Sequence, residues 1–151
     1  MESVTYNDPI SQGSLLLKCK VQPGDLPGIA KPYRPREYEA YQALQSTPLK
    51  DFIPKLYGKD THNDTEYIII SDITAGFESV CLADLTIGTR QSDIDTNEQV
   101  RDICLQTEHD TTSGSLGVRL ASTTIRHGVP PEVVKEWTKT EGMEFNYDEL
   151  Q

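Results

Sequence analysis

Residues 81–90 read Cys-Leu-Ala-Asp-Leu-Thr-Ile-Gly-Thr-Arg, a short apolar strand that carries one carboxylate and runs into a turn. The carboxylate belongs to Asp84. Burying an unpaired charge on such a strand is costly, so we expect Asp84 to face a cleft, a cation or a ligand hydroxyl. Because Gly88, Thr89 and Arg90 follow where the chain turns, this stretch is the first candidate for a phosphate site. The alternative is that Asp84 caps the turn at the strand end.

The same stretch resembles the signature of the inositol polyphosphate kinases, Pro-x-x-x-Asp-x-Lys-x-Gly. The resemblance is strongest to the inositol hexakisphosphate kinase form, in which the strand ends Asp-Leu-Lys-Met-Gly-Thr-Arg-Gln. The matching positions are Asp84, Leu85, Gly88, Thr89, Arg90 and Gln91. Val80 replaces the family's Pro, and Thr86 replaces its Lys, which contacts substrate phosphate. A hydroxyl donates a hydrogen bond but brings no charge, so the resemblance implies the family and leaves its activity open.

Further blocks occur in the family's order and extend the resemblance over about residues 13–120. They are a first hairpin strand at residues 13–18, a Pro-Arg-Glu helix start at residues 35–37 with Tyr41, a turn at residues 52–58, a strand and hinge at residues 67–77, and a late strand at residues 112–119. Ala40 stands where the family has Phe. Blocks in a fixed order are far more specific than one short motif.

The resemblance assigns roles to seven residues. It implies that Lys18 contacts ATP phosphates, that Glu37 pairs with Lys18 and orients it, and that the Asp72–Ile73 hinge offers backbone groups to adenine. It places Asp84 on the ribose or on a substrate hydroxyl, as the catalytic residue, and Thr86 and Arg90 at the substrate. Without the resemblance, Lys18 is an exposed strand residue, Glu37 is a first-turn acid favoured by the helix dipole, and Asp72 belongs to an ordinary turn.

Composition and charge exclude several classes of protein. A net charge of -10 argues against nucleic acid and anionic membrane as partners, since both need a basic surface. The charge is also unfavourable for an inositol phosphate, because residues 92–102 carry one base among four acids. Three widely spaced cysteines fit reduced thiols better than a disulfide framework or a zinc site. With no apolar run of about 20 residues and no secretory signal at the start, we expect a cytoplasmic or nuclear protein.

The resemblance implies a two-lobe, kinase-like α+β fold of the inositol polyphosphate kinase type, with an amino lobe and a truncated carboxyl lobe. The predicted domains are the amino lobe at 1–72, the hinge, signature strand and inositol-binding insertion at 73–127, and a C-terminal helix with an acidic tail at 128–151. The expected elements are strands at 14–21, 67–70 and 116–124, a Pro- and Gly-rich loop at 23–35, and helices at 36–45, after 97 and at 132–138.

The family completes its site with a Ser-Leu-Leu strand and an Ile-Asp-Phe segment, whose Asp holds magnesium. Neither occurs after Arg119, so no residue is assigned to a metal. Three hypotheses remain open. The chain is an inositol polyphosphate kinase that uses ATP and magnesium, or a pseudokinase lobe that binds nucleotide or a protein partner without turnover, or an incomplete product of a longer gene. The acidic residues 141–151 are either a frayed tail or the segment that binds such a partner.

Overall fold

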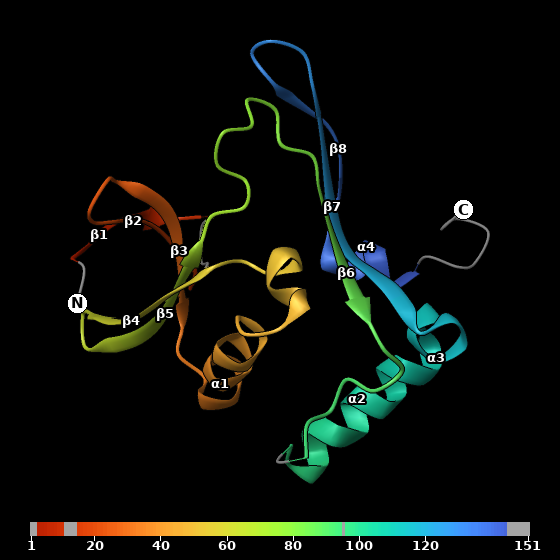
Figure 1. Ribbon diagram of the computed structural model, residues 1–151. Coiled ribbons are helices and arrows are strands. Elements are labelled where there is room, and N and C mark those ends of the chain that lie inside the picture. Colours follow the sequence, from red (N-terminus) through yellow and green to blue (C-terminus); the bar gives the residue numbers. More distant parts are fainter. Residues whose placement is uncertain (1–2, 11–14, 95, 145–151) are drawn as a thin grey trace. The chain divides into compact units, whose positions relative to one another are not determined.

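Residues 3–10, 15–94 and 96–144 are described by the computed structural model, in which contacts separate residues 1–76 from residues 77–151 as two units (Figure 1). Both units combine strands with helices, in line with the predicted α+β class. The predicted division at 72 and 127 stays a prediction. Two predictions lie partly outside the described residues, namely the start of the first hairpin strand at 13–14 and the end of the acidic tail at 145–151.

The described part of the first unit forms a five-stranded antiparallel sheet with the strand order β1-β2-β3-β5-β4. Its strands are β1 (Val4–Pro9), β2 (Leu17–Val21), β3 (Leu26–Pro32), β4 (Leu56–His62) and β5 (Thr65–Ser71). The apolar run Tyr67–Ile70 on β5 is buried along its whole length, as its continuous hydrophobicity predicts. Asn63 and Asp64 have positive φ in the turn that joins β4 to β5, a conformation that suits a tight hairpin.

One face of this sheet carries a buried cluster of the first unit, and Ile68 and Ile70 of β5 are buried on the other face. The buried cluster contains Cys19 and Val21 from β2, Ala30 from β3, and Tyr67 and Ile69 from β5. Because successive side chains of a strand point to opposite faces, the residues between them lie on the other face. The helix α1 (Pro35–Leu44) and the 3₁₀ helix η1 (Pro48–Phe52) follow β3. Proline at the first position of α1 fits a place where its missing N–H is not needed.

The described part of the second unit has a three-stranded antiparallel sheet with the order β6-β7-β8. Its elements are β6 (Leu82–Ile87), α2 (Glu98–Asp110), α3 (Thr112–Leu116), β7 (Val118–His127), β8 (Glu132–Trp137) and α4 (Lys139–Glu144). The side chain of Asn97 caps α2 by accepting a hydrogen bond from the N–H of Val100. Figure 1 shows α4 beside β7, a contact that brings Gly142 against the carbonyl of Leu120.

Two predicted elements are wrong throughout, and the late strand predicted at 112–119 is wrong over residues 112–116, which form the helix α3 before β7 begins at Val118. Residues 26–32, predicted as loop because of Pro27, Gly28 and Pro32, form the strand β3 between β2 and β5. Residues 132–137, predicted as helix, form the strand β8, which pairs with β7 across the turn at 128–131. The sequence Glu-Val-Val-Lys-Glu-Trp is rich in the β-branched and aromatic residues that strands favour, and the short turn returns the chain alongside β7. No described helix has both the length and the apolar character needed to cross a membrane.

Candidate functional site

Lysines gather on the face of the first sheet that lies opposite this buried cluster. Lys18 pairs across β2 and β3 with Ile29, two residues before Lys31, so both lysines share one face. Lys20 is two residues from Lys18, and Lys59 lies opposite Ile68, as Lys31 does. The sheet therefore presents positive charge on one side, although the chain as a whole has a net charge of -10. Such a face favours an anionic ligand.

An ion pair on this face joins Lys31 to Glu37. The sequence predicted that Glu37 would pair with Lys18, and its partner in the structure is Lys31 instead. The Nζ of Lys31 donates to Oε1 of Glu37 at 2.5 Å, and both side chains are partly exposed, at 38% and 26%. Lys31 is near the end of β3, six residues before Glu37 in the first turn of α1. Lys18 lies one strand farther from the helix, on β2, and is exposed.

Aromatic side chains hold another lysine of the face. Nζ of Lys59 lies 4.4 Å from the ring centroid of Tyr33 and 5.3 Å from that of Tyr38. An ammonium over a ring face is attracted by the ring's quadrupole, which fixes this charge beside α1. Lys31 and Lys59 are therefore each held by a specific partner, through a carboxylate in one case and through two rings in the other.

The predicted hinge begins directly after β5. The side chain of Asp72 accepts hydrogen bonds from the N–H of Thr74 at 2.8 Å and from its hydroxyl at 2.6 Å. The N–H of Asp72 donates to the carbonyl oxygen of Pro27. The backbone N–H of Asp72, which was expected to bond to adenine, is therefore already bonded within the protein. The carboxylate of Asp72 stabilises the turn, as expected if Asp72 belongs to an ordinary turn. Ile73 has a side chain that is 66% exposed, and its role toward adenine stays a prediction.

The signature strand β6 is exposed rather than buried. Asp84 is exposed and pairs across the sheet with Ser122, so its charge needs no buried partner and is accessible to a ligand. After the strand, Gly88 adopts φ 112°, and its N–H donates to the carbonyl oxygen of Gly117, which itself has φ 69°. Only glycine adopts such angles without strain, which explains the glycine of the motif. Arg90, two residues after Gly88, is exposed.

Thr86, in the place of the signature lysine, contacts a buried arginine. Arg119 on β7 lies directly opposite Thr86, is only 4% exposed, and donates through Nη2 to Oγ1 of Thr86 at 3.5 Å and to Oε1 of Gln91 at 3.2 Å. Its Nε and Nη1 have no hydrogen-bond partner among the described residues. A buried guanidinium that is only partly satisfied is costly, and a nearby anion offsets that cost. The end of β6 is therefore a favourable place for negative charge.

Gln91 connects Arg119 to the helices of the second unit. Its side-chain amide also donates to Oγ of Ser113, and its backbone N–H donates to Oε1 of Glu108 on α2. The residue after the signature arginine thus fixes three groups at once: the buried guanidinium, the start of α3 and a carboxylate of α2.

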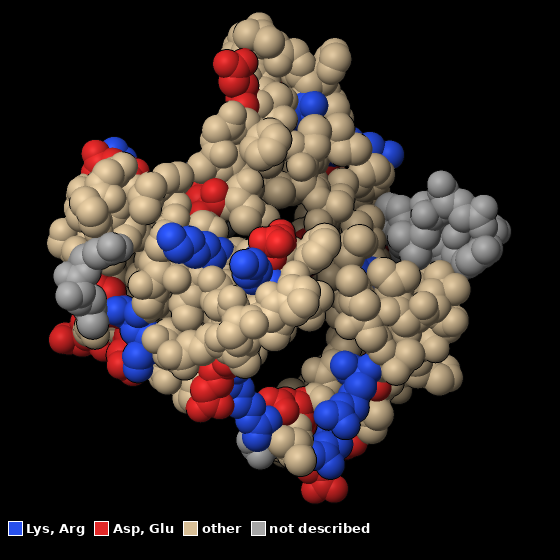
Figure 2. Space-filling view, viewed as in Figure 1, with Lys and Arg blue, Asp and Glu red and all other residues tan. Residues whose placement is uncertain are grey.

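A hollow of about 540 Å³ lies beside this network. Its lining residues are Thr89, Arg90, Ser92, Asp93, Ile94, Arg101, Leu105 and Glu108. Two arginines and two carboxylates face the same space, together with two hydroxyls. Figure 2 shows both basic and acidic surface over the region where Figure 1 places α2. The predicted substrate residue Arg90 is therefore brought together with Arg101, which the sequence analysis did not assign to the site.

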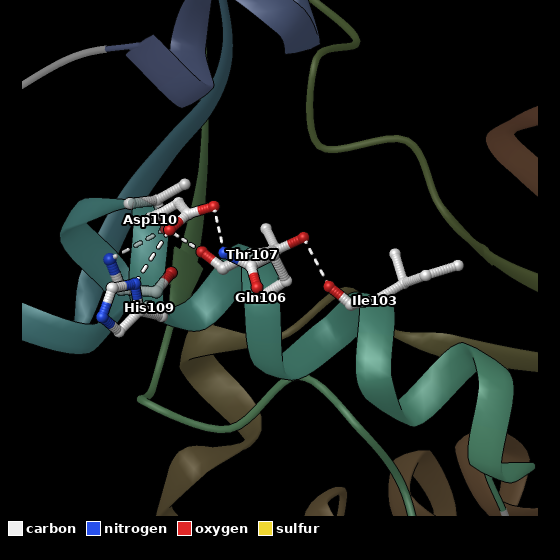
Figure 3. Close-up of polar contacts among 7 residues, drawn as sticks. Ile103, Gln106, Thr107, His109 and Asp110 are labelled. Atoms are coloured by element: carbon white, nitrogen blue, oxygen red, sulfur yellow. Dashed lines mark hydrogen bonds and ion pairs between the residues drawn. The ribbon is translucent and has the colours of Figure 1, made fainter.

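A second hollow, of about 390 Å³, lies between the end of α2 and α4. Figure 3 shows the polar contacts at this end of α2, where Asp110 receives hydrogen bonds from His109 at 2.8 Å and from the side chain of Gln106 at 2.6 Å. These bonds, with that of His109 first, hold the pKa of Asp110 below its usual value. The hydrogen bonds of this carboxylate come from side chains of its own helix, so these contacts belong to the C-terminal end of α2.

No ready-made cluster of metal ligands is found in the described part of the chain. Nowhere in residues 3–10, 15–94 and 96–144 do three or more His, Cys, Asp or Glu side chains come together as a ligand set. Mg²⁺ prefers oxygen ligands in octahedral geometry and is usually held by carboxylates together with substrate phosphates.

Neither Lys31 nor Arg119 is among the site residues predicted from the sequence. Lys31 lies in the segment predicted as loop, whereas the structure places it on the strand β3. The available signal was its spacing, since it ends a short apolar stretch six residues before the glutamate of the Pro-Arg-Glu helix start. Arg119 was recognised as part of a strand motif, but its burial beside Thr86 depends on the pairing of β6 with β7, which a single strand does not reveal.

Comparisons with known proteins bear on the family and the fold of the chain. The family model of the inositol polyphosphate kinases matches residues 67–151. The inositol phosphate multikinase Ipk2 from S. cerevisiae, solved in complex with ADP and Mn²⁺, has a TM-score of 0.68 at 21% identity, over 82% of this chain and 54% of that one. A second inositol phosphate multikinase structure has a TM-score of 0.60 at 16% identity, over 76% and 53%. The chain thus spans about half the length of these structures, and no curated protein sequence matches it.

Proposed function

Because the chain belongs to the inositol polyphosphate kinase family, we propose that it binds ATP and transfers the terminal phosphate to a hydroxyl or to a phosphate group of an inositol polyphosphate. The observation that carries this proposal is the Lys31–Glu37 pair, in which a lysine at the end of a central strand is held by a glutamate of the next helix. Kinases use a strand lysine paired to a helix glutamate to position nucleotide phosphates. In the proposal Lys31 contacts the ATP phosphates, and Glu37 fixes its direction.

The second unit supplies the groups for the inositol phosphate. Arg90 and Arg101 line the hollow beside the signature strand and bind substrate phosphates, since a guanidinium can hold a phosphate through two parallel hydrogen bonds. Arg119 adds a fixed positive charge behind Thr86. Asp84 accepts a hydrogen bond from a hydroxyl of the substrate or of the ribose, which orients that hydroxyl.

A second candidate function is nucleotide binding without turnover. It is favoured by Thr86, which brings no charge in the place of the signature lysine, and by the lack of a metal ligand set among the described residues. Phosphoryl transfer depends on positioning and on neutralising the charge that develops, so losing both a lysine and a metal ligand lowers the rate by several powers of ten. This candidate keeps the nucleotide role of Lys31 and gives up the transfer step.

Product formation separates the two candidates. The chain is incubated with ATP, Mg²⁺ and a series of inositol phosphates, and transfer of labelled terminal phosphate is followed. The kinase proposal predicts phosphorylated inositol product that falls at least about a hundredfold in Asp84→Asn, in the range usual for loss of a group that acts on a proton. Asp51→Asn, at an exposed position of η1, is the matched control and retains the activity. ATP binding with no product would favour the second candidate.

The match of residues 84–91 to the hexakisphosphate kinase form of the signature favours inositol hexakisphosphate as the substrate. That preference rests on sequence likeness and is a separate point from the proposed reaction.

A further inference from the structure

We propose that the chain associates with a second copy of itself, and that Phe52 of each copy enters a hollow beside α1 of the other copy. The hollow has a volume of about 250 Å³ and lies within the first unit. Its lining residues are Glu37, Ala40, Tyr41, Leu44, Ile53 and Pro54. The hollow and the ring that fills it are neighbours in the chain, because Phe52 directly precedes Ile53.

The hollow suits an apolar ring. The described lining residues other than Glu37 are apolar or aromatic. An apolar cavity of about 150 Å³ is enough to hold benzene, so this hollow has room for the ring of a phenylalanine. Ala40 is exposed, and the hollow therefore opens to the surface at that residue. Burial raises the pKa of Tyr41, in keeping with surroundings of low polarity.

Hydrogen bonds hold one wall of the hollow in place. The side-chain amide of Gln45, the residue after α1, donates to the carbonyl oxygen of Pro54 at 3.3 Å. The N–H of Lys55 donates to Oγ of Ser71 at 2.9 Å, and the carbonyl oxygen of Lys55 accepts from the N–H of Ser71 at 2.8 Å. The wall is thus tied to the end of α1 and to the end of β5. A site formed in advance avoids part of the entropy cost of ordering its walls when a partner binds.

The helix η1 presents a ridge that matches the hollow. Side chains three residues apart in a 3₁₀ helix lie over one another, so Leu49 and Phe52 share one side of η1. Leu49 is 53% exposed, and Phe52 is 85% exposed. Apolar surface in water costs about 25 cal/mol per Å², so moving this ring into an apolar hollow is favourable.

The ridge and the hollow lie on the same surface, which suits a two-fold dimer. The helix η1 follows α1 in Figure 1 and contacts it, and the wall residues Ile53 and Pro54 come directly after η1. In a two-fold dimer the same surface of both copies meets, so the ridge of each copy faces the hollow of the other. Two rings are therefore buried in one dimer.

Charges on this surface favour the same arrangement. The helix α1 carries one basic and two acidic side chains, whereas residues 48–55 carry two basic side chains and one acidic. Because α1 of one copy faces residues 48–55 of the other, excess charges of opposite sign meet. The whole chain has a net charge of -10, which makes other pairs of surfaces repel on average.

The proposed contact reaches the Lys31–Glu37 pair, because Glu37 lines the hollow and also holds Lys31. Only this link to the nucleotide rests on the proposed function, and the dimer does not. A contact built on one ridge and one hollow per copy is small, so we expect a weak, reversible dimer.

Sedimentation of the full chain from about 10 µM to about 1 mM, where weak contacts become populated, tests the proposal. We expect the unmodified chain to dimerise. If each ring contributes about a factor of ten, Phe52→Ala loses two rings and weakens the dimer about a hundredfold. Ala40→Phe should weaken it as strongly, because the new ring fills the hollow of its own copy. Phe77→Ala, which removes a 68% exposed ring from the second unit, is the matched control and retains the dimer.

A mixture of the two variants is the most specific arm of the test. Phe52→Ala keeps an open hollow and lacks the ring, whereas Ala40→Phe keeps the ring and lacks an open hollow. In the mixture the ring of one variant enters the hollow of the other. The mixed dimer should therefore be about tenfold tighter than the dimer of either variant alone. Circular dichroism checks that both variants are folded.

Three results would overturn the proposal. The unmodified chain would stay monomeric over the whole concentration range, which would leave the hollow to another occupant. Alternatively, a dimer would form and persist in Phe52→Ala or in Ala40→Phe, so that another surface would be responsible. Finally, the mixture would associate no more tightly than the separate variants, and the ring would then not enter the hollow. In all three cases the proposed kinase function would still stand.

Discussion

At the scale of single residues, the Lys31–Glu37 pair is better explained by positioning than by stability. Ion pairs with exposed partners contribute only about 0.2–1 kcal/mol to folding, and both side chains here keep part of their surface in water. What the pair does provide is direction, since it holds a flexible lysine at the end of β3. Substituting Lys31 should therefore cost little stability, which makes its role in ligand binding measurable on a folded protein.

Cys19 and Cys81 should differ strongly in reactivity. Burial in the core of the first sheet raises the pKa of Cys19 to about 11, and the nearby carboxylates of Asp72 and Asp60 add to the rise. At pH 8 only about one Cys19 in a thousand is then a thiolate, the form that reacts. Alkylation by iodoacetamide followed by mass spectrometry should label the exposed Cys81 first. Labelling of Cys19 at the same rate at pH 8 would contradict its burial.

The same shift affects stability in alkaline solution. A folded-state pKa above the unfolded value means that the neutral thiol of Cys19 stabilises the fold below the unfolded pKa, near 8.5, and that this contribution is lost as the pH rises toward 11. Cys19→Ala should flatten the decline of the melting temperature between pH 9 and about 11 while lowering stability near pH 7, because it leaves a small cavity. If the melting temperature of Cys19→Ala falls with pH as steeply as that of the unmodified chain, other groups cause the alkaline loss of stability.

At the scale of elements, there is unfilled space beside α1 at Ala40, a position where the family has the larger Phe. A hollow of about 250 Å³ is lined by Glu37, Ala40, Tyr41, Leu44, Ile53 and Pro54, and the family has Phe where this chain has Ala40. Ala40→Phe should fill that space and raise the free energy of unfolding by about 0.5–2 kcal/mol. Ala43→Phe, elsewhere on α1, is the matched control and should not stabilise. Denaturant unfolding of both variants would measure the difference, and equal effects would contradict the packing described.

The elements that could be predicted are those with strong local signals. The helix α1 begins at a proline with an acid in its first turn, and β5 is a continuous apolar run, so both were predicted close to their bounds. The strand β3 was missed because two prolines and a glycine normally interrupt strands, yet here the pairing with β2 and β5 outweighs that preference. The strand β8 was missed because Pro131 suggests a helix start, whereas pairing with β7 decides the outcome.

At the scale of the whole molecule, the order of motifs predicted the fold better than it predicted the site. The α+β fold agrees with the solved multikinase structures, and the family model covers the second half of the chain. The site residues depended on pairings between distant segments. Glu37 meets Lys31 through the β3–α1 connection, and Thr86 meets Arg119 across two strands. Neither partner follows from a motif that is read one segment at a time.

The central claim is that Lys31 holds the phosphates of a nucleotide, and calorimetric titration with ATP tests it most directly, whether or not turnover occurs. Lys31→Met should weaken ATP binding at least about tenfold, equivalent to about 1.4 kcal/mol, while Lys50→Met on η1 leaves it unchanged. Greater weakening in Lys18→Met than in Lys31→Met would return the role to Lys18. ATP binding by Lys31→Met that is as tight as that of the unmodified chain would contradict the account.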